Sequence, residues 1–262
     1  MLAVLSPAKS LDLETPVPAV TATEPRFAAD AAKLAKGAAK LTRAKLRALM
    51  HISQPLAELN AARFRAFDPS DAPAATRPAL FTFDGDVYAG LRGPAMDAAT
   101  RRFAQDHVRI LSGLYGVLRP LDAMQPYRLE MGIEFGVGRA KTLYAFWGDR
   151  IARALAEDLA GHADPTLINL ASVEYFGAVA VDRLPGRVLA IDFRDDHDGE
   201  LRFNTFVAKK ARGSMARFLC DHRLDHPEGL KDFTDDGYRY DKARSDEDRW
   251  LFVRPAKATR KA

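Results

Sequence analysis

Three short segments of the sequence carry side chains that could bind an anion or act on one. The first, SPAKS, places Ser6, Lys9 and Ser10 directly after a short apolar run. A lysine beside exposed backbone amides favours an anion site at this position. The segment lacks the glycines and the spacing of a P-loop, so phosphate binding and an ordinary turn with a surface lysine both remain open.

The second segment, AKKARGSMAR, groups Lys209, Lys210, Arg212 and Arg217 without an acidic residue between them. On a helix, Lys209 and Arg212 share a face at spacing i, i+3, whereas Lys210 points away from it. The helix dipole opposes cations near a helix start, so we expect an anionic partner there. The alternatives are an anion-binding surface and a solvated helix face.

The third segment, LSGLYGVLRPLDAMQPYRLEMG, combines turn residues with polar side chains. Gly113 and Gly116 follow an apolar run, as in the hairpin of helix-hairpin-helix modules, where glycine amides approach a phosphate backbone. These glycines are three residues apart, whereas the usual hairpin separates them by two. Further along, Arg128 and Glu130 are more typical of a polar pocket, in which Glu130 orients Arg128 or a lysine of the basic helix.

Histidines give only a weak metal signal. His222 and His226 are four residues apart in DHRLDH, but the glutamate of a zinc-protease helix is missing and Pro227 follows at once. The segment DDHDG is typical of a solvated hairpin tip. We therefore predict no metal site and no cofactor. A Ser/His/Asp or Cys/His signature is also missing, so the sequence neither indicates nor excludes an enzymatic activity.

Composition indicates one large globular domain or two small ones. The 262 residues are 47% hydrophobic, and 39 Lys and Arg against 35 Asp and Glu give a net charge of +4, which attracts polyanions only mildly. The single cysteine, Cys220, fits a reducing cytoplasm and is expected to be buried on a helix. We expect no signal peptide and no membrane span, because the start of the chain has no basic leader and no apolar run is long enough.

Periodicity and turn residues predict strands mixed with helices along the whole chain. Strands are expected at 2–5, 79–83 and 166–172, and hairpins from 188–193 with 200–206 and from 237–241 with 249–253. Helices are expected at 142–160 and 207–224, with two or three more within 26–67. We therefore predict a single α+β or mixed α/β domain over 1–262, with a partly antiparallel sheet flanked by helices.

The predicted helices within 26–67 carry a row of basic residues. Their 3-4-3-4 spacing would give a continuous basic stripe only on one unbroken helix, and Thr42 and Ser53 are expected N-caps that divide it. A solvated helix surface and a polyanion-facing surface both remain open. The residues are Lys33, Lys36, Lys40, Arg43 and Arg47.

Five motifs together, in this order, closely resemble the bacterial YaaA family (DUF328/UPF0246). They are SPAKSL, GDVYAGL, LSGLYGVLRPLDAMQPYRLEMG, INLAS followed by EYF, and KKARGSMARF. The resemblance spans nearly the whole chain. It implies a cytoplasmic protein of the hydrogen-peroxide stress response that lowers free intracellular iron and limits oxidative damage. It also implies binding of double-stranded and branched DNA, an unusual α/β fold, a positively charged cleft and a helix-hairpin-helix element.

Carried over by position, the resemblance gives a set of expected DNA-binding residues. These are expected to face a common positively charged cleft together with Lys9. The set comprises Gly113, Gly116 and Arg119 of the hairpin-like motif and Lys209, Lys210 and Arg212 of the basic helix.

Two hypotheses follow for the function. The first is a stress protein that binds DNA through backbone contacts, largely independent of sequence. The second is an enzyme that acts on an anionic or nucleotide-like small molecule in a pocket formed by Lys9, Arg128, Glu130 and Lys210. Direct iron sequestration ranks third, because no specific ligand cluster is visible. No partner protein is predicted.

Overall fold

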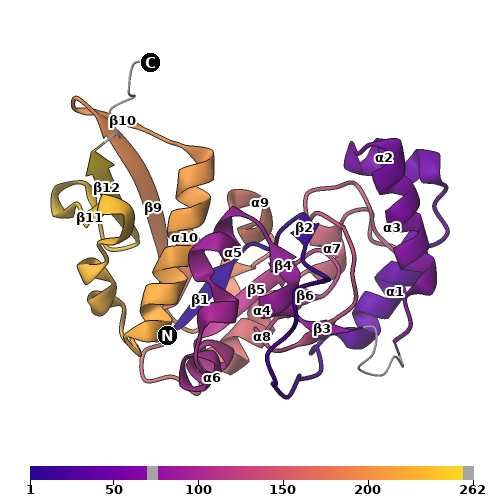
Figure 1. Cartoon of the computed structure of the whole chain (residues 1–262), viewed down its shortest axis with the longest axis horizontal. Helices are drawn as coiled ribbons and strands as arrows, with labels where there is room; N and C mark the ends of the chain where they lie inside the picture. The colour runs from indigo at the N-terminus through magenta and orange to yellow at the C-terminus, as the bar shows by residue number, and fades with distance from the viewer. Residues whose placement is uncertain (70–75, 256–262) are drawn as a thin grey trace.

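Five parallel strands form the centre of one mixed sheet. The computed structural model describes residues 1–69 and 76–255. The strands of the main sheet are β1 (Leu2–Leu5), β5 (Val108–Ser112), β6 (Gly116–Leu118), β8 (Leu167–Leu170), β9 (Val188–His197), β10 (Glu200–Arg202), β11 (Arg239–Tyr240) and β12 (Arg249–Pro255). They lie in the order β11-β12-β9-β8-β1-β5-β6, with β10 paired to β9 (Figure 1). Among the described strands of this sheet, only β6, β10 and β11 run antiparallel to their neighbours, which confirms the predicted mixed sheet.

The order of the parallel strands creates a crevice beside β1. The chain enters the sheet at β1, adds β5 on one side, and then returns to place β8, β9 and β12 on the other side. Numbered by appearance, this is the order 2-1-3-4-5. The chain leaves β1 towards β5 and leaves β8 towards β9, in opposite directions along the sheet. The carboxyl ends of these two strands therefore form a switch point, where α/β proteins commonly bind ligands.

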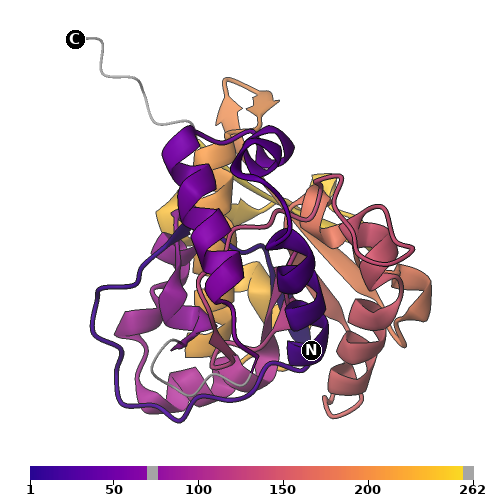
Figure 2. The same cartoon turned by 90° about the vertical axis from the view of Figure 1, so that its right-hand side faces the viewer.

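The apolar run LAVL explains why β1 occupies the centre. All four residues are buried, and Leu2 pairs with Leu167 on one side while Ala3 pairs with Val108 on the other. A strand covered on both faces needs a continuous apolar sequence rather than an alternating one. Helices lie on both sides of the sheet, with α10 (Thr205–Asp221) on one side and α8 (Arg150–Leu159) on the other (Figure 2).

Helix α10 packs backbone to backbone on the short helix α5 (Asp86–Leu91). A Cβ atom added to Gly213 would lie 1.7 Å from the carbonyl oxygen of Val87, and one added to Gly90 would lie 2.1 Å from that of Lys210. Only glycine permits such an approach. The contact fixes the position of α10 against α5.

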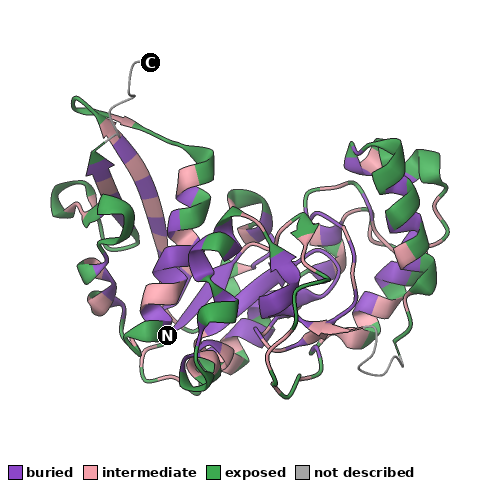
Figure 3. Cartoon of the chain, viewed as in Figure 1, coloured by how far each residue is buried: buried purple, intermediate pink, exposed green. Residues whose placement is uncertain are grey.

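Three helices form an arm at the end of the molecule farthest from β11 and β12 (Figure 1). They are α1 (Ala28–Ala38), α2 (Arg43–Met50) and α3 (Gln54–Ala66), so the expectation of two or three helices is confirmed. Thr42 caps α2 by accepting a hydrogen bond from the Lys45 amide, and Ser53 is the N-cap residue of α3 without a side-chain hydrogen bond. The basic residues of 33–47 are exposed and divided between helices (Figure 3).

Two predicted elements are wrong. The run 79–83 forms a buried helical turn, α4 (Ala79–Thr82), followed by the two-residue strand β4 (Phe83–Asp84). Periodicity does not separate a short buried strand from a short buried helix. The predicted helix 142–160 is interrupted at Gly148, whose φ of +53° divides it into α7 (Leu143–Trp147) and α8.

Both predicted hairpins are confirmed. Asp198 and Gly199 have positive φ at the tip between β9 and β10, as a tight two-residue turn requires. The strand predicted at 166–172 is β8, and the helix predicted at 207–224 is α10. Across residues 1–69 and 76–255, the remaining elements are β2 (Ser10–Leu11), β3 (Arg77–Pro78), β7 (Ala123–Met124), α6 (Ala98–His107), α9 (Val173–Phe176) and short 3-10 helices at Gly93–Ala95, Val181–Arg183, Pro227–Asp232, Asp235–Gly237 and Lys242–Arg244.

Within the described residues, every helix is too short or too polar to cross a membrane. Cys220 is a free, buried cysteine on α10, as expected.

Candidate functional site

A cavity of about 370 Å³ lies at the carboxyl ends of β1 and β8, and we call it the switch-point pocket. Its walls come from the loop after β1, the turn between β4 and α5, the turn between β8 and α9, and helix α10. Its polar lining residues are Ser6, Lys9, Ser10, Asp84, Asp86, Ser172, Glu174, Tyr175, Lys209 and Arg212. Segments distant in sequence therefore meet where the strand order opens the sheet.

The pocket brings together two of the three anion-binding segments identified in the sequence. Lys9 comes from the loop after β1, and Lys209 and Arg212 come from one face of α10. Lys210 does not line this pocket: its Nζ lies 3.0 Å from Oδ2 of Asp236. The helical spacing therefore separates two adjacent lysines into different environments.

Glu130 links Lys9 to Arg128. Oε1 of Glu130 accepts a hydrogen bond from Nε of Arg128 at 3.0 Å and forms an ion pair with Nζ of Lys9 at 3.6 Å. The side chain of Glu130 is 9% exposed, and its second oxygen, Oε2, is buried without a hydrogen-bond partner among the described residues. A buried carboxylate oxygen of this kind calls for a ligand or a water molecule as its partner. Three of the four predicted pocket residues are thus connected, while Lys210 is not.

The two strand ends that meet at the pocket are joined by serines. The Ser172 amide donates a hydrogen bond to Oγ of Ser6 at 2.8 Å, and the two hydroxyl oxygens lie 3.3 Å apart. Oγ of Ser172 also accepts from the Tyr175 amide as the N-cap of α9. These hydroxyls lie beside the cations, where they can donate hydrogen bonds to an anionic oxygen.

Buried tyrosines lie near Ser6 and Glu130. Tyr88 donates a hydrogen bond to the carbonyl oxygen of Ser6 at 3.2 Å, and the hydroxyls of Tyr127 and Ser112 lie 2.6 Å apart. Burial raises the pKa of Tyr88, Tyr127 and Tyr175 well above the usual range, and the Glu130 charge raises those of Tyr127 and Tyr175 further. These phenols therefore remain protonated at neutral pH and act as hydrogen-bond donors rather than bases.

Carboxylates also line the pocket. Asp84 and Asp86 are exposed and form no ion pair within the described part of the chain, whereas Glu174 accepts a hydrogen bond from the Gly132 amide at 3.0 Å. The cations and carboxylates together suit a ligand that is anionic at one end. Near Asp84 and Asp86 such a ligand would present hydrogen-bond donors or an accompanying divalent cation.

The hairpin-like glycines lie in the core. The segment forms the β5–β6 hairpin, in which Ser112 pairs with Gly116, and it joins two strands rather than two helices. A Cβ on Gly113 would lie 2.2 Å from the carbonyl oxygen of Leu129, and one on Gly116 would lie 2.8 Å from the Trp147 ring. The structure thus does not confirm a helix-hairpin-helix element, and it accounts for both glycines by close packing.

Arg119 lies outside the switch-point pocket. Its Nε and Nη2 each lie 3.0 Å from Oδ1 of Asp122, and Nη2 also donates to the carbonyl oxygen of Glu24. Of the six expected DNA-binding residues, only Lys209 and Arg212 line this pocket.

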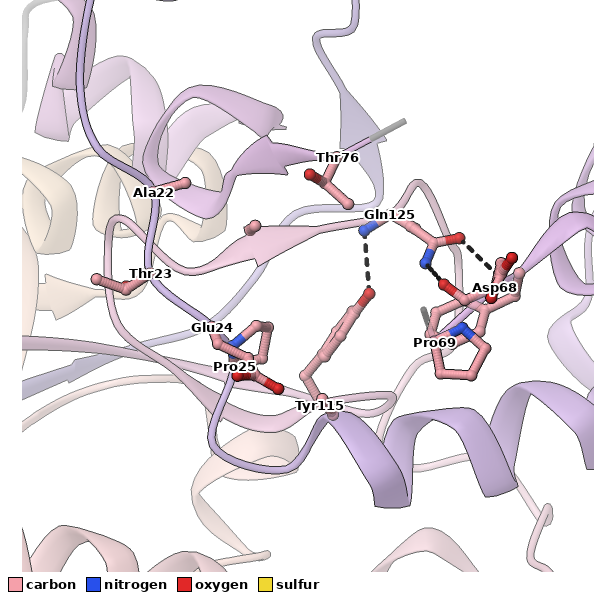
Figure 4. A pocket seen from close by; sticks show the side chains of 12 residues that line it. Ala22, Thr23, Glu24, Pro25, Asp68, Pro69, Thr76, Tyr115 and Gln125 are labelled. Atoms are coloured by element: carbon pink, nitrogen blue, oxygen red, sulfur yellow. Dashed lines mark hydrogen bonds between the residues drawn. The ribbon is translucent and has the colours of Figure 1, made fainter. Parts of the chain in front are cut away.

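A second cavity, of about 330 Å³, lies where the arm joins the body of the protein (Figure 4). In it, the backbone amide of Gln125 donates a hydrogen bond to the Tyr115 hydroxyl at 3.0 Å. The Gln125 side chain accepts a hydrogen bond from the Asp68 amide and donates one to the Asp68 carbonyl oxygen. These bonds anchor the chain after α3 to β7.

The weak histidine motif is split in space. Helix α10 ends at Asp221, so His226 lies beyond it, with Nδ1 3.4 Å from Oδ2 of Asp164. Across residues 1–69 and 76–255, no group of three or more His, Cys, Asp or Glu side chains is placed to hold a metal ion.

Sequence reasoning missed Asp84, Asp86, Ser172 and Tyr175. Asp86, Ser172 and Tyr175 belong to the motifs GDVYAGL and INLAS with EYF, and Asp84 directly precedes GDVYAGL, but the resemblance assigned none of them a role. Two of them, Ser172 and Tyr175, follow a parallel strand directly. A position after a parallel strand indicates a ligand site only once the strand order of the sheet is known.

Comparison with known proteins gives a consistent result across the chain. Residues 1–244 match the family described as "Peroxide stress protein YaaA". A UPF0246 protein of Caulobacter vibrioides (strain NA1000 / CB15N) is 51% identical over 255 residues, which cover 97% of this chain and 99% of that protein. UPF0246 proteins of Rhizorhabdus wittichii and Tolumonas auensis are 51% and 49% identical, with 97% of this chain covered and 99% and 98% of those proteins. This chain therefore belongs to the YaaA family of peroxide stress proteins.

Proposed function

We propose that this protein is a cytoplasmic enzyme of the peroxide stress response that binds and acts on a small anionic molecule in the switch-point pocket. The observation that carries the proposal is the convergence of Lys9, Lys209 and Arg212 with the Ser6 and Ser172 hydroxyls at the carboxyl ends of β1 and β8. In folds with this strand order, that position is the usual ligand site.

The charges around Glu130 favour an anion. The single negative charge of Glu130 is shared by two cations, because Lys9 and Arg128 both form ion pairs with the same oxygen of its carboxylate. The side chain of Lys9 is 66% exposed and lines the pocket, so it can contact a ligand while its partner stays buried. We assign Lys9, Lys209 and Arg212 to anion binding, and Glu130 to positioning Lys9 and Arg128.

Adjacent lysines provide the test. With pyrophosphate as the probe, isothermal titration calorimetry should show binding that Lys209→Ala weakens by about tenfold or more, as expected for loss of one charge-assisted contact. Lys210→Ala removes the same charge one residue away and should change the affinity by less than about twofold. Equal effects of the two substitutions, or no binding of pyrophosphate or of any other diphosphate ligand, would rule out this pocket.

The same proposal includes the effect on iron that the family resemblance implies. We propose that the protein limits free intracellular iron through its ligand in this pocket. In peroxide-treated cells, electron paramagnetic resonance of chelatable iron should then show higher iron with Lys209→Ala than with Lys210→Ala. Equal iron levels in cells that contain equal amounts of the two variants would show that the pocket does not control free iron.

DNA binding is a second candidate function, and the arm favours it. Between Arg26 and Asp68 the chain has nine Lys and Arg against three Asp and Glu, which gives a net charge of +6. This local net charge exceeds the net charge of +4 of the whole chain. The cations at 33–47 are exposed. A surface of this kind suits sequence-independent contacts to a phosphate backbone.

Salt dependence distinguishes this surface from the pocket. Affinity for duplex or branched DNA should fall steeply with salt, and the triple substitution Lys36→Glu, Lys40→Glu and Lys45→Glu on the arm should flatten that dependence. The triple substitution Lys209→Ala, Lys210→Ala and Arg212→Ala tests the expected basic helix in the same way. If neither set changes the salt slope, DNA is not bound by these surfaces.

A further inference from the structure

A third cavity, of about 470 Å³, lies beside the switch-point pocket, and we call it the side pocket. It occupies the space beyond the end of β8, next to β9 and α9. Residues that define its character include Val173, Phe176, Asp192, Arg194, Phe203 and Arg212. Arg212 lines both cavities, so the two adjoin at this side chain.

Arg212 has unsatisfied hydrogen-bonding capacity at this junction. Its Nε is buried without a hydrogen-bond partner, and its guanidinium group forms no ion pair, among the residues that the structure describes. The neighbouring charges are those of Asp192, which favours the cation, and Arg194, which opposes it. An anionic group held between the two cavities would satisfy Arg212.

The side pocket differs from the switch-point pocket in its apolar surface. Phe203 is 48% exposed and Val173 is 92% exposed, although both are apolar. The guanidinium carbon of Arg194 lies 4.9 Å from the centre of the Phe203 ring, and Phe176 contributes a second aromatic side chain. Exposed aromatic and arginine side chains around a cavity suit a planar aromatic ring, which stacks on both.

Polar groups at the edge of the side pocket can contact such a ring. Asn169 uses its Oδ1 to accept a hydrogen bond from the Ala171 amide, which leaves its side-chain NH2 as a donor. Asp192 accepts from Arg194 at 2.8 Å through one carboxylate oxygen. Each cavity also has a volume within the range of small-molecule sites.

We propose that the two cavities form one site for a nucleotide. Its phosphates lie in the switch-point pocket between Lys9, Lys209 and Arg212, and its base lies in the side pocket against Phe203. This inference rests on the proposed function, because it specifies the class of anionic molecule that the switch-point pocket receives.

The experiment compares complete and partial ligands on the full chain by isothermal titration calorimetry. The probes are nucleoside diphosphates (ADP, GDP, UDP and CDP), pyrophosphate and the free nucleosides. At least one nucleoside diphosphate should bind about tenfold or more tightly than pyrophosphate, which is the gain expected from stacking one base. If every nucleoside diphosphate binds no more tightly than pyrophosphate, the inference is wrong while the proposed function stands.

Matched substitutions locate the base. Phe203→Ala should lower affinity for the nucleoside diphosphate by about tenfold and leave pyrophosphate binding within about twofold. Phe206→Ala is the control, because Phe206 is 72% exposed and does not line the side pocket. Equal effects of Phe203→Ala on both probes would overturn the base assignment.

Two further results separate this inference from the proposed function. Lys209→Ala should weaken nucleoside diphosphate and pyrophosphate alike, because both place phosphate in the switch-point pocket. If neither probe binds, the proposed function fails together with the inference. If only duplex DNA binds and Phe203→Ala weakens it, the site recognises nucleic acid and the nucleotide proposal is overturned.

Discussion

Lys209 and Lys210 are adjacent on α10 and contact different parts of the protein. Lys209 lines the switch-point pocket, whereas Nζ of Lys210 lies 3.0 Å from Oδ2 of Asp236. One residue corresponds to about 100° of rotation on a helix, so the basic segment presents only part of its charge to the pocket. The contact of Gly213 with Val87 fixes the orientation of α10 on α5, and this orientation determines which cations face the pocket.

Glu130→Gln tests the positioning role of the carboxylate. The substitution keeps the shape of the side chain but removes the charge that holds Lys9 and Arg128. We expect loss of peroxide protection in complemented cells and a decrease of about 1–3 kcal/mol in the free energy of unfolding. Glu228→Gln, at an exposed ion pair with Lys231, should preserve protection. Full protection by Glu130→Gln would exclude a role for the charge.

Gly213→Ala tests the contact between α10 and α5. Because the added Cβ would lie 1.7 Å from the carbonyl oxygen of Val87, the helices must separate. We expect the free energy of unfolding in urea to fall by about 3 kcal/mol or more. Gly161→Ala is the control, since its nearest neighbour is 3.7 Å away, and it should change stability by less than about 1 kcal/mol. Equal effects would contradict the close approach.

Gly116→Ala distinguishes packing from DNA contact in the hairpin. Gly116 has a φ of +69° and lies against the Trp147 ring, whereas Gly138 has a φ of +68° with no atom within 4 Å. Gly138→Ala should cost about 1–2 kcal/mol from backbone strain alone, and Gly116→Ala should cost more in thermal or urea unfolding. A variant of Gly116 that keeps full stability but loses DNA affinity would instead favour the hairpin as a DNA contact.

Cys220 should not act as a peroxide-reactive thiol. Burial raises the pKa of its thiol to about 12, so the reactive thiolate is scarce at physiological pH. We expect the native protein to react with a thiol reagent at pH 8 much more slowly than the urea-unfolded protein, and peroxide to leave the thiol intact by mass spectrometry. Rapid oxidation of the native protein would disprove this prediction.

His162 should make the protein less stable in mild acid. Burial, and secondarily the charges of the chain's amino terminus, His107 and Arg109, lower the pKa of His162 from 6.5 to about 4. Below pH 6.5 the unfolded chain gains a proton that the folded chain does not, so stability falls between pH 6.5 and about 4. His162→Gln should reduce this slope in urea titrations, and an unchanged slope would contradict the prediction.

The sequence determined the elements whose signals are local. The apolar run at 2–5, the tight turn at Asp198 and Gly199 and the long helix around Lys209 all form as predicted, because neighbouring residues decide them. The strand predicted at 79–83 and the single helix predicted at 142–160 are wrong, because 79–82 forms a helical turn and the helix is interrupted at Gly148. A short buried run suits a strand or a helix equally until its packing partners are known.

The site was decided mainly by tertiary structure. From the sequence, Lys9, Arg128 and Glu130 were recognised as a polar cluster, but Lys210 was included with them and the packed glycines Gly113 and Gly116 were assigned to a phosphate-binding hairpin. Which strand ends meet depends on pairing between segments more than a hundred residues apart, such as Leu5 with Leu170. Only that pairing brings Ser6, Ser172 and Arg212 to one cavity, and no local pattern encodes it.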